Sequence, residues 1–211
     1  MRPVICMITD GCLAAAAGDW LARVAAAVRA GVHLVQIRER GIDDRVLSAA
    51  VAQCVDLVRG TRTRVIVNDR LDIALGFGAH GVHLRSDSFP ARRARTIVPP
   101  GFLVGRSIHG GDDVAVARES VDYVIFGTVF ATSSKPGRPP AGTAALAEAV
   151  RASSVPVLAV GGVSADNAGL VAQAGAAGIA AISLFSDSAP AAAQSAVERI
   201  VCAFDLPLGG S

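Results

Sequence analysis

Short apolar runs recur along the chain, and longer Ala-rich segments separate them. Eight runs have the length and composition of β-strands: Val4–Thr9, His33–Arg38, Val65–Asn68, Gly81–Leu84, Leu103–Ser107, Tyr123–Phe126, Val157–Val160 and Gly178–Ser183. Apolar residues fall at helical spacing in the segments Trp20–Arg29, Asp43–Val58, Gly142–Ala152 and Ala189–Cys202. Alternation of strands and helices is typical of βαβ units and predicts a parallel sheet.

Eight units favour a closed barrel, because open doubly wound sheets usually have fewer strands. The runs Val65–Val67 and Val157–Val160 contain no polar alternates, as expected for strands that are buried on both faces. A chain of 211 residues is near the lower limit for such a barrel, and no linker or low-complexity tract divides it. We therefore predict an α/β fold, a (β/α)₈ TIM barrel, with residues 1–211 as a single domain.

Composition and charge narrow the class of protein. Hydrophobic residues make up 52% of the chain, but no window approaches the roughly 20 apolar residues of a membrane helix. Residues 1–10 are interpreted as a first strand, not as a signal peptide. A net charge of +2 with one Trp and one Tyr argues against nucleic-acid binding. The four cysteines lack metal or disulfide spacing, which is typical of reduced thiols in a cytoplasmic protein. A homo-oligomer is left open.

Polar residues cluster directly after the predicted strands. The carboxyl ends of barrel strands share one rim, where barrel enzymes place their active sites. Each residue alone could instead cap the next helix, but the set favours a functional rim. The clustered positions are Thr9–Asp10, Arg38–Arg40, Asn68–Arg70, Ser107, His109, Thr132–Lys135, Gly161–Gly162 and Ser183.

The last two strands are expected to hold a phosphate group. Gly161 and Gly162 follow the seventh strand, and Ser183 ends the eighth. Loops seven and eight form the usual phosphate site of this barrel, where backbone N–H groups face the anion. The alternative is that the Gly pair only makes a tight turn.

Other rim residues suggest further contacts with an anionic ligand. The loop Thr132–Lys135 could fold over an anion as a lid or be an ordinary solvated loop. Arg38 and Arg40 could form a fork for phosphate or carboxylate or pair with Glu39 or Asp69.

Two rim positions could supply chemistry. Asp69, after Asn68, could bind Mg²⁺ or cap the next helix. His109, two residues after Ser107, is the histidine best placed for proton transfer, whereas the other three histidines are interpreted as structural.

Taken together, the strand-end motifs resemble the thiamine-phosphate synthase and TenI superfamily over nearly the whole chain. The motifs are Ile8–Asp10, Val35–Arg38, Val67–Arg70, Gly81–Leu84, Asp122–Val124, Gly127–Phe130, Ala159–Gly162 and Ile182–Ser183. The resemblance implies a (β/α)₈ barrel that binds a thiazole phosphate. The synthase joins a pyrimidine pyrophosphate to that thiazole phosphate with loss of pyrophosphate, whereas TenI proteins aromatise a thiazole carboxylate phosphate by moving a proton.

The resemblance also implies roles for individual residues. Gly161, Gly162 and Ser183 would hold the thiazole phosphate. The synthase positions for the pyrimidine or pyrophosphate match Gln36, Arg38, Asn68, Thr132, Ser134 and Lys135.

Two segments depart from the family patterns. After His83–Leu84 the synthase continues Gly-Gln-x-Asp, but this chain has Arg85–Ser88, so a second Mg²⁺ carboxylate is missing unless Asp87 replaces it. The TenI branch matches better at Ile37–Arg40, Ser88–Phe89, Gly105–His109 and Tyr123–Gly127, yet Thr128 stands where TenI has its catalytic histidine.

The leading hypothesis is a metal-free thiazole tautomerase. In it Arg38 or Arg40 binds the carboxylate, Ser107 lies beside the substrate, and His109 or a water held by Thr128 moves the proton. The alternative is a thiamine-phosphate synthase that binds Mg²⁺ through Asp69. A third hypothesis, from another class, is a non-catalytic thiazole-phosphate binder or regulator.

Overall fold

The computed structural model describes residues 2–11, 13, 20–110, 120–132, 137, 139–186 and 190–205. These residues form a closed parallel barrel in which each strand pairs with its neighbours in chain order and β8 pairs with β1. The strands are β1 (Val4–Ile8), β2 (Leu34–Ile37), β3 (Arg64–Asn68), β4 (Gly81–Leu84), β5 (Leu103–Ile108), β6 (Tyr123–Gly127), β7 (Val157–Val160) and β8 (Gly178–Ala181).

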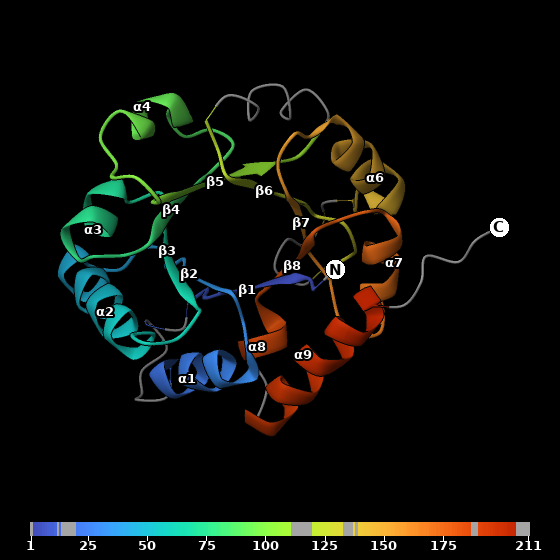
Figure 1. The fold of residues 1–211 in the computed structure, drawn as a ribbon, viewed down its shortest axis with the longest axis horizontal. Helices are drawn as coiled ribbons and strands as arrows, with labels where there is room; N and C mark the ends of the chain where they lie inside the picture. The colour runs from blue at the N-terminus through green and yellow to red at the C-terminus, as the bar shows by residue number, and fades with distance from the viewer. Residues whose placement is uncertain are drawn as a thin grey trace.

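Helices surround the barrel (Figure 1). They are α1 (Trp20–Ala30), α2 (Asp44–Leu57), α3 (Leu71–Gly76), α4 (Ala91–Arg95), α6 (Gly142–Ala152), α7 (Ala168–Gln173), α8 (Ser183–Ser186) and α9 (Pro190–Asp205). The predicted fold class is confirmed. Most strands differ from the prediction by one residue at one or both ends. The largest difference among the strands is at the eighth, which ends at Ala181, so that Ser183 begins the short helix α8.

Side chains alternate between two apolar layers along each strand. Inward-pointing residues such as Cys6, Ile66 and Leu158 fill the barrel interior. Outward-pointing residues such as Val65 and Val82 pack against the helices. This double burial explains why the strands are continuous apolar runs in the sequence.

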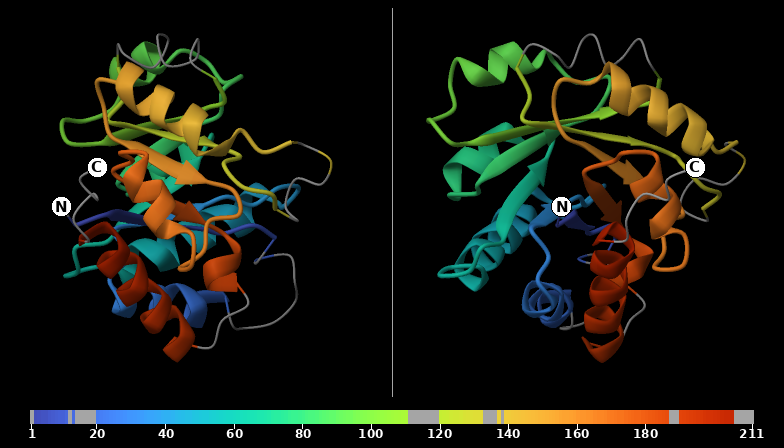
Figure 2. Two further views of the ribbon diagram at one scale, coloured as in Figure 1. Left: turned by 90° about the vertical axis from the view of Figure 1, so that its right-hand side faces the viewer. Right: turned by 45° about the vertical axis from the view of Figure 1, so that its right-hand side comes forward.

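The first and last helices lie side by side on the outside of the barrel. Helix α9 lies beside α1 and α7 (Figures 1 and 2). The short helix α8 lies toward the end of the barrel opposite the amino terminus (Figure 2, left). Helix α8 therefore follows β8 directly at the rim where the sequence places ligand binding.

The described cysteines are free thiols in two environments. Cys6 and Cys54 are buried, and burial raises the pKa of each thiol to about 12. Cys202 is exposed on α9, and Cys12 lies outside the described residues. Thiolate is the reactive form, so Cys6 and Cys54 are inert side chains of the core.

Among the described residues, no helix combines the length and the hydrophobicity needed to cross a bilayer.

Closure of the barrel brings β8 very close to β1. Val4 pairs with Gly178, and a Cβ atom on Gly178 would lie 1.9 Å from the Val4 carbonyl oxygen and 2.6 Å from its nitrogen. These are backbone atoms of a paired strand, so they cannot move aside without breaking the register. Gly178 is therefore required by the closure itself.

We expect Gly178→Ala to destabilise the fold by about 1–3 kcal/mol, the usual cost of overpacking, because the backbone atoms of Val4 cannot move aside. The matched control is Gly169→Ala in α7, where a Cβ would meet nothing within 4 Å. It should leave stability unchanged or raise it by up to about 1 kcal/mol. Urea unfolding of both variants checks the prediction, and equal stabilities would contradict it.

Candidate active site

A cavity of about 570 Å³ opens at the carboxyl ends of the strands. Its volume is within the usual range for small-molecule sites, roughly 300–1,000 Å³. Most of the residues predicted from the sequence line this cavity: Gln36, Arg38, Arg40, Asn68, Ser107, His109, Thr128, Thr132, Gly161, Gly162 and Ser183. Ser134 and Lys135 lie outside the described residues.

Sequence reasoning gave no binding role to part of the cavity wall. His83, Arg85 and Ser86 line it, together with Asp10, which the sequence placed only at the rim, and Asp87, which was considered only as a replacement metal ligand. The signal for most of them was their place at or just after a strand end. The apolar floor of the cavity includes Ile8, Ile125, Val160 and Ala180. Asp69 is absent from the lining and faces the loop after β4 instead.

Gly161 and Gly162 are required by a close approach of two loops. Both have positive φ angles, +97° and +63°. A Cβ on Gly161 would lie 2.4 Å from Thr128 Cγ2, and one on Gly162 would lie 2.3 Å from the carbonyl oxygen of Ala131. The loop after β7 thus fits against the loop after β6, and its backbone is uncovered where it lines the cavity.

Gln36 and Asn68 form a polar pair across neighbouring strands. Gln36 points inward from β2 and is 2% exposed. Its Nε2 donates to Asn68 Oδ1 at 3.0 Å, and its buried Oε1 has no hydrogen-bond partner among the described residues. A buried carbonyl oxygen without a donor costs about 1–3 kcal/mol. A ligand that offers an N–H or O–H group here would recover that free energy.

Arg38 forms an ion pair with a different carboxylate from the two that the sequence suggested. Its guanidinium contacts Asp10 at 2.8 Å, not Glu39 or Asp69. Asp10 follows β1, so this pair links the first two strand ends, and the Arg38 backbone N–H is also held by Thr9 Oγ1 at 3.0 Å. Arg40 is exposed and lines the same cavity.

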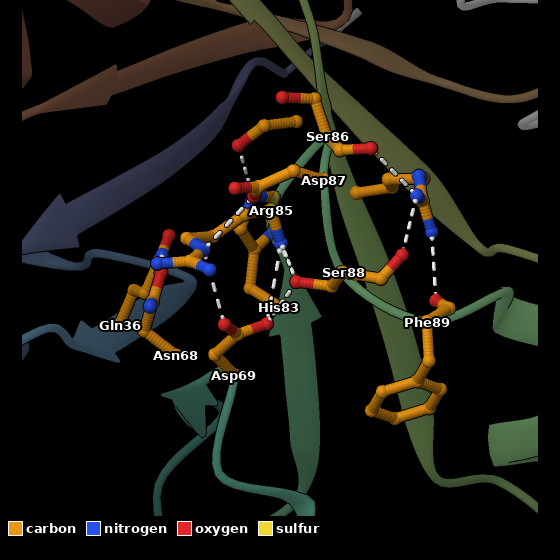
Figure 3. A network of polar contacts seen from close by, with 11 residues as sticks. Gln36, Asn68, Asp69, His83, Arg85, Ser86, Asp87, Ser88 and Phe89 are labelled. Atoms are coloured by element: carbon orange, nitrogen blue, oxygen red, sulfur yellow. Dashed lines mark hydrogen bonds and ion pairs between the residues drawn. The ribbon is translucent and has the colours of Figure 1, made fainter.

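Asp69 is held by the loop after β4, and the helix-cap interpretation is wrong. It has a left-handed backbone (φ 63°), which Asp and Asn adopt more readily than other side chains. Ser88 Oγ donates to Asp69 Oδ1. Arg85 Nε lies 3.1 Å from Asp69 Oδ2 and 3.1 Å from Asp87 Oδ1. Figure 3 shows Arg85 between the two carboxylates.

A buried guanidinium fixes the loop that carries Arg85. Arg106 points outward from β5 and is 6% exposed. It donates to three backbone carbonyl oxygens: Ser86 at 2.8 Å, Ser88 at 3.1 Å and Phe89 at 3.1 Å. A buried charge is tolerated when its hydrogen bonds are made, and these bonds shape the loop directly after β4.

His83 is an uncharged part of the cavity wall. Its Nε2 lies 2.9 Å from Ser107 Oγ, and its Nδ1 lies 3.3 Å from the Tyr123 hydroxyl. Burial, reinforced by the nearby charges of Arg38 and Arg106, lowers the pKa of His83 to about 3. The sequence analysis interpreted His83 as a structural residue, and both of its ring nitrogens do have hydrogen-bond partners. The ring also lines the cavity.

The other histidines divide into structural and cavity residues. His33 Nδ1 accepts from the Ile5 N–H, and His80 Nδ1 accepts from the Val65 N–H, as the structural interpretation predicts. His109 Nδ1 donates to the carbonyl oxygen of Gly127 at 2.6 Å. In its neutral form the ring then carries its lone pair on Nε2. His109 and Thr128 both line the cavity.

The carboxylates at this rim do not fit a divalent metal. Both oxygens of Asp69 are engaged, one by Ser88 and one by Arg85, and Asp87 shares the same guanidinium. Within the described part of the chain, no three His, Cys, Asp or Glu side chains are grouped closely enough to hold a metal ion. Mg²⁺ prefers several oxygen ligands that can face it directly.

The fold and the cavity define a (β/α)₈ barrel with a ligand site at the carboxyl ends of its strands, the usual place of an active site in this class. Residues 5–185 match the family model described as thiamine monophosphate synthase (TMP-TENI). The chain belongs to this family, which acts in thiamine biosynthesis.

Individual relatives agree with this assignment. The chain is 42% identical over 187 residues to the thiamine-phosphate synthase of Methanoculleus marisnigri, covering 87% of this chain and 88% of that protein. It is 38% identical over 184 residues to the thiamine-phosphate synthase of Roseiflexus castenholzii, covering 86% and 80%. The thiamine phosphate pyrophosphorylase structure from Pyrococcus furiosus aligns with a TM-score of 0.82 and 27% identity, covering 95% of each chain. The family resemblance is confirmed, but these names do not favour the TenI branch.

The low pKa of His83 makes a prediction about stability and pH. An unfolded histidine binds its proton near pH 6.5, whereas folded His83 binds it near pH 3. Between these values the unfolded state holds more protons, so stability falls as the pH falls. From pH 7 to pH 4 we expect His83 to account for a loss of roughly 3 kcal/mol.

His83→Gln removes this titration while keeping groups that hydrogen-bond. Urea unfolding of the native protein and this variant at pH 7, 5.5 and 4 should show the steeper loss only in the native protein. Carboxylate titrations are common to both and cancel in the comparison. Parallel pH profiles would show that His83 is not held neutral.

Proposed function

We propose that this protein is a thiamine-phosphate synthase, which joins hydroxymethylpyrimidine pyrophosphate to a thiazole phosphate with loss of pyrophosphate. The names of its relatives at 37–42% identity support this reaction over the tautomerase hypothesis. The structural observation that carries the proposal is the Gln36–Asn68 pair in the cavity.

Gln36 and Asn68 suit a heterocycle with an amino group. The unpaired Gln36 Oε1 needs a donor, and an aminopyrimidine offers N–H groups. By family resemblance these two residues match pyrimidine or pyrophosphate positions. A thiazole carboxylate phosphate, the substrate of the alternative reaction, has no comparable exocyclic amine, so it leaves this buried acceptor unexplained.

The cavity has room for a second substrate at its other end. Gly161, Gly162 and Ser183 line the side formed by β7 and β8, where this barrel class commonly binds phosphate. We assign the thiazole phosphate to this side. The pyrophosphate of the pyrimidine substrate would then face Arg40 and Arg85, which line the opposite wall. Guanidinium groups stabilise the negative charge of the departing pyrophosphate.

A thiazole tautomerase is the second candidate, and two observations favour it. Arg85 pairs with Asp69, the Mg²⁺ carboxylate of the synthase alternative, and with Asp87, the displaced candidate for the missing second carboxylate. His109 Nδ1 donates to the Gly127 carbonyl oxygen, so the basic nitrogen of the neutral ring is Nε2. A general base needs a ring nitrogen that is held in this way. In this reaction Arg38 or Arg40 would bind the substrate carboxylate, and Thr128 would hold a water.

Two assays on the purified protein separate the candidates. One supplies both synthase substrates and measures thiamine phosphate, with Mg²⁺ and again with EDTA. The other supplies the unaromatised thiazole carboxylate phosphate and follows the aromatic absorbance. We expect turnover in the first assay. Turnover only in the second would establish the tautomerase and overturn the proposal, and tight thiazole-phosphate binding without turnover in either would establish a non-catalytic binder.

Gln36→Leu tests the pyrimidine position directly. The change removes the orphan acceptor and the donor to Asn68, so we expect condensation to fall about 10- to 100-fold, equivalent to about 1.4–2.8 kcal/mol. Thiazole-phosphate binding should change less than about twofold. Gln53→Leu, the same change at an exposed position of α2, is the matched control. Equal loss of pyrimidine and thiazole binding in Gln36→Leu would contradict the assignment.

A further inference from the structure

The carboxylates of Asp69 and Asp87 share a cation that belongs to the chain itself. Arg85 Nε is 3.1 Å from an oxygen of each, and Ser88 donates to the remaining oxygen of Asp69. A guanidinium has five N–H donors and is always charged. Asp69 is three-quarters buried at its side chain, whereas Arg85 and Asp87 are more exposed.

The loop after β4 presents Arg85 in this position. The Arg85 backbone N–H donates to Ser88 Oγ at 3.0 Å, so Ser88 connects this backbone to Asp69. Arg106 donates to the carbonyl oxygens of Ser86, Ser88 and Phe89, and Figure 3 labels these three residues of the loop. The position of Arg85 therefore follows from a loop that is fixed at several points.

We propose that Arg85 takes the place of a divalent cation at Asp69 and Asp87. The protein then binds phosphorylated ligands with a tethered guanidinium, and it excludes Mg²⁺ from this pair. Two carboxylates without further protein ligands hold Mg²⁺ weakly. Arg85 already pairs with both carboxylates and therefore competes with Mg²⁺ for them. A positive side chain at contact distance also repels an incoming cation. This proposal concerns the resident cation and holds for either candidate reaction.

Arg85 can also act on the ligand side of the pair, because it lines the cavity. Its Nε faces the carboxylates, and its terminal nitrogens carry further N–H donors. Diphosphate oxygens accept such bonds in a bidentate arrangement. The cation in this barrel is thus expected to be present before any ligand arrives and to be insensitive to chelators.

Arg85→Ala tests the exclusion of metal. The probe is Mn²⁺ alone, followed by the loss of the free-ion signal in electron paramagnetic resonance. We expect Arg85→Ala to bind Mn²⁺ at least tenfold more tightly than the native protein. Arg92→Ala removes an equivalent, exposed guanidinium from α4 and should behave like the native protein. Equal Mn²⁺ binding by the native protein and Arg85→Ala, at any affinity, would overturn the proposal.

A double variant locates the gained metal site. Arg85→Ala combined with Asp69→Asn should lose the new Mn²⁺ binding, and Asn tolerates the left-handed backbone at this position. If the double variant still binds Mn²⁺ as tightly as Arg85→Ala, the ion binds elsewhere and the proposal is wrong. Circular dichroism of each variant verifies that the barrel is folded.

Inorganic diphosphate tests the ligand side. With EDTA present, isothermal titration should show that the native protein binds diphosphate and that Arg85→Ala binds it at least fivefold more weakly. Mn²⁺ should restore part of the affinity of Arg85→Ala and leave that of Arg92→Ala unchanged. Undiminished diphosphate binding by Arg85→Ala in EDTA would overturn the role of Arg85 as an anion ligand.

Discussion

The pairing of β8 with β1 is the constraint on which the rest of this structure depends. At Val4 and Gly178 the two backbones are so close that no side chain fits between them. Because all the strands are parallel and the ring is closed, their carboxyl ends meet around one opening. Residues as distant in the chain as Gln36 and Ser183 thereby line one cavity.

Inside the barrel, the inward positions of β2 and β3 change from apolar to polar toward the carboxyl ends of these strands. On β2 the buried Leu34 is followed two residues later by Gln36, and on β3 Ile66 is followed by Asn68. Leu34 and Ile66, farther from the opening, fill the interior with hydrocarbon. Gln36 and Asn68, nearer the opening, supply hydrogen-bonding groups to the cavity wall. Because side chains two residues apart point to the same face of a strand, one strand contributes both to the core and to the site.

The strands and the rim were predictable from the sequence because both depend on local patterns. Apolar runs and the polar residues that follow them are visible within a few positions of each other. The partner of each polar side chain was not predictable, because it comes from another strand end. Arg38 pairs with Asp10 rather than with its neighbour Glu39, and Asp69 binds Ser88 and Arg85 instead of capping α3.

The consequence of having Arg85–Ser88 in place of the family's Gly-Gln-x-Asp could be seen only in three dimensions. From the sequence alone, the change is interpreted as the loss of a metal-binding carboxylate. In the structure, Ser88 still contacts Asp69 through its hydroxyl, and Arg85 supplies positive charge at the same place. The segment therefore links the third and fourth strand ends and places a guanidinium beside Asp69.

The cationic groups that line this end of the cavity belong to the chain itself. Arg38, Arg40 and Arg85 all line it, and burial keeps His83 neutral well below pH 6.5. If His83 carried a charge, it would add a cation deep in the wall, next to Gln36 and Asn68, where a neutral heterocycle is expected to bind. Keeping His83 neutral confines positive charge to the guanidinium groups at the rim and leaves the inner wall suited to an uncharged ring.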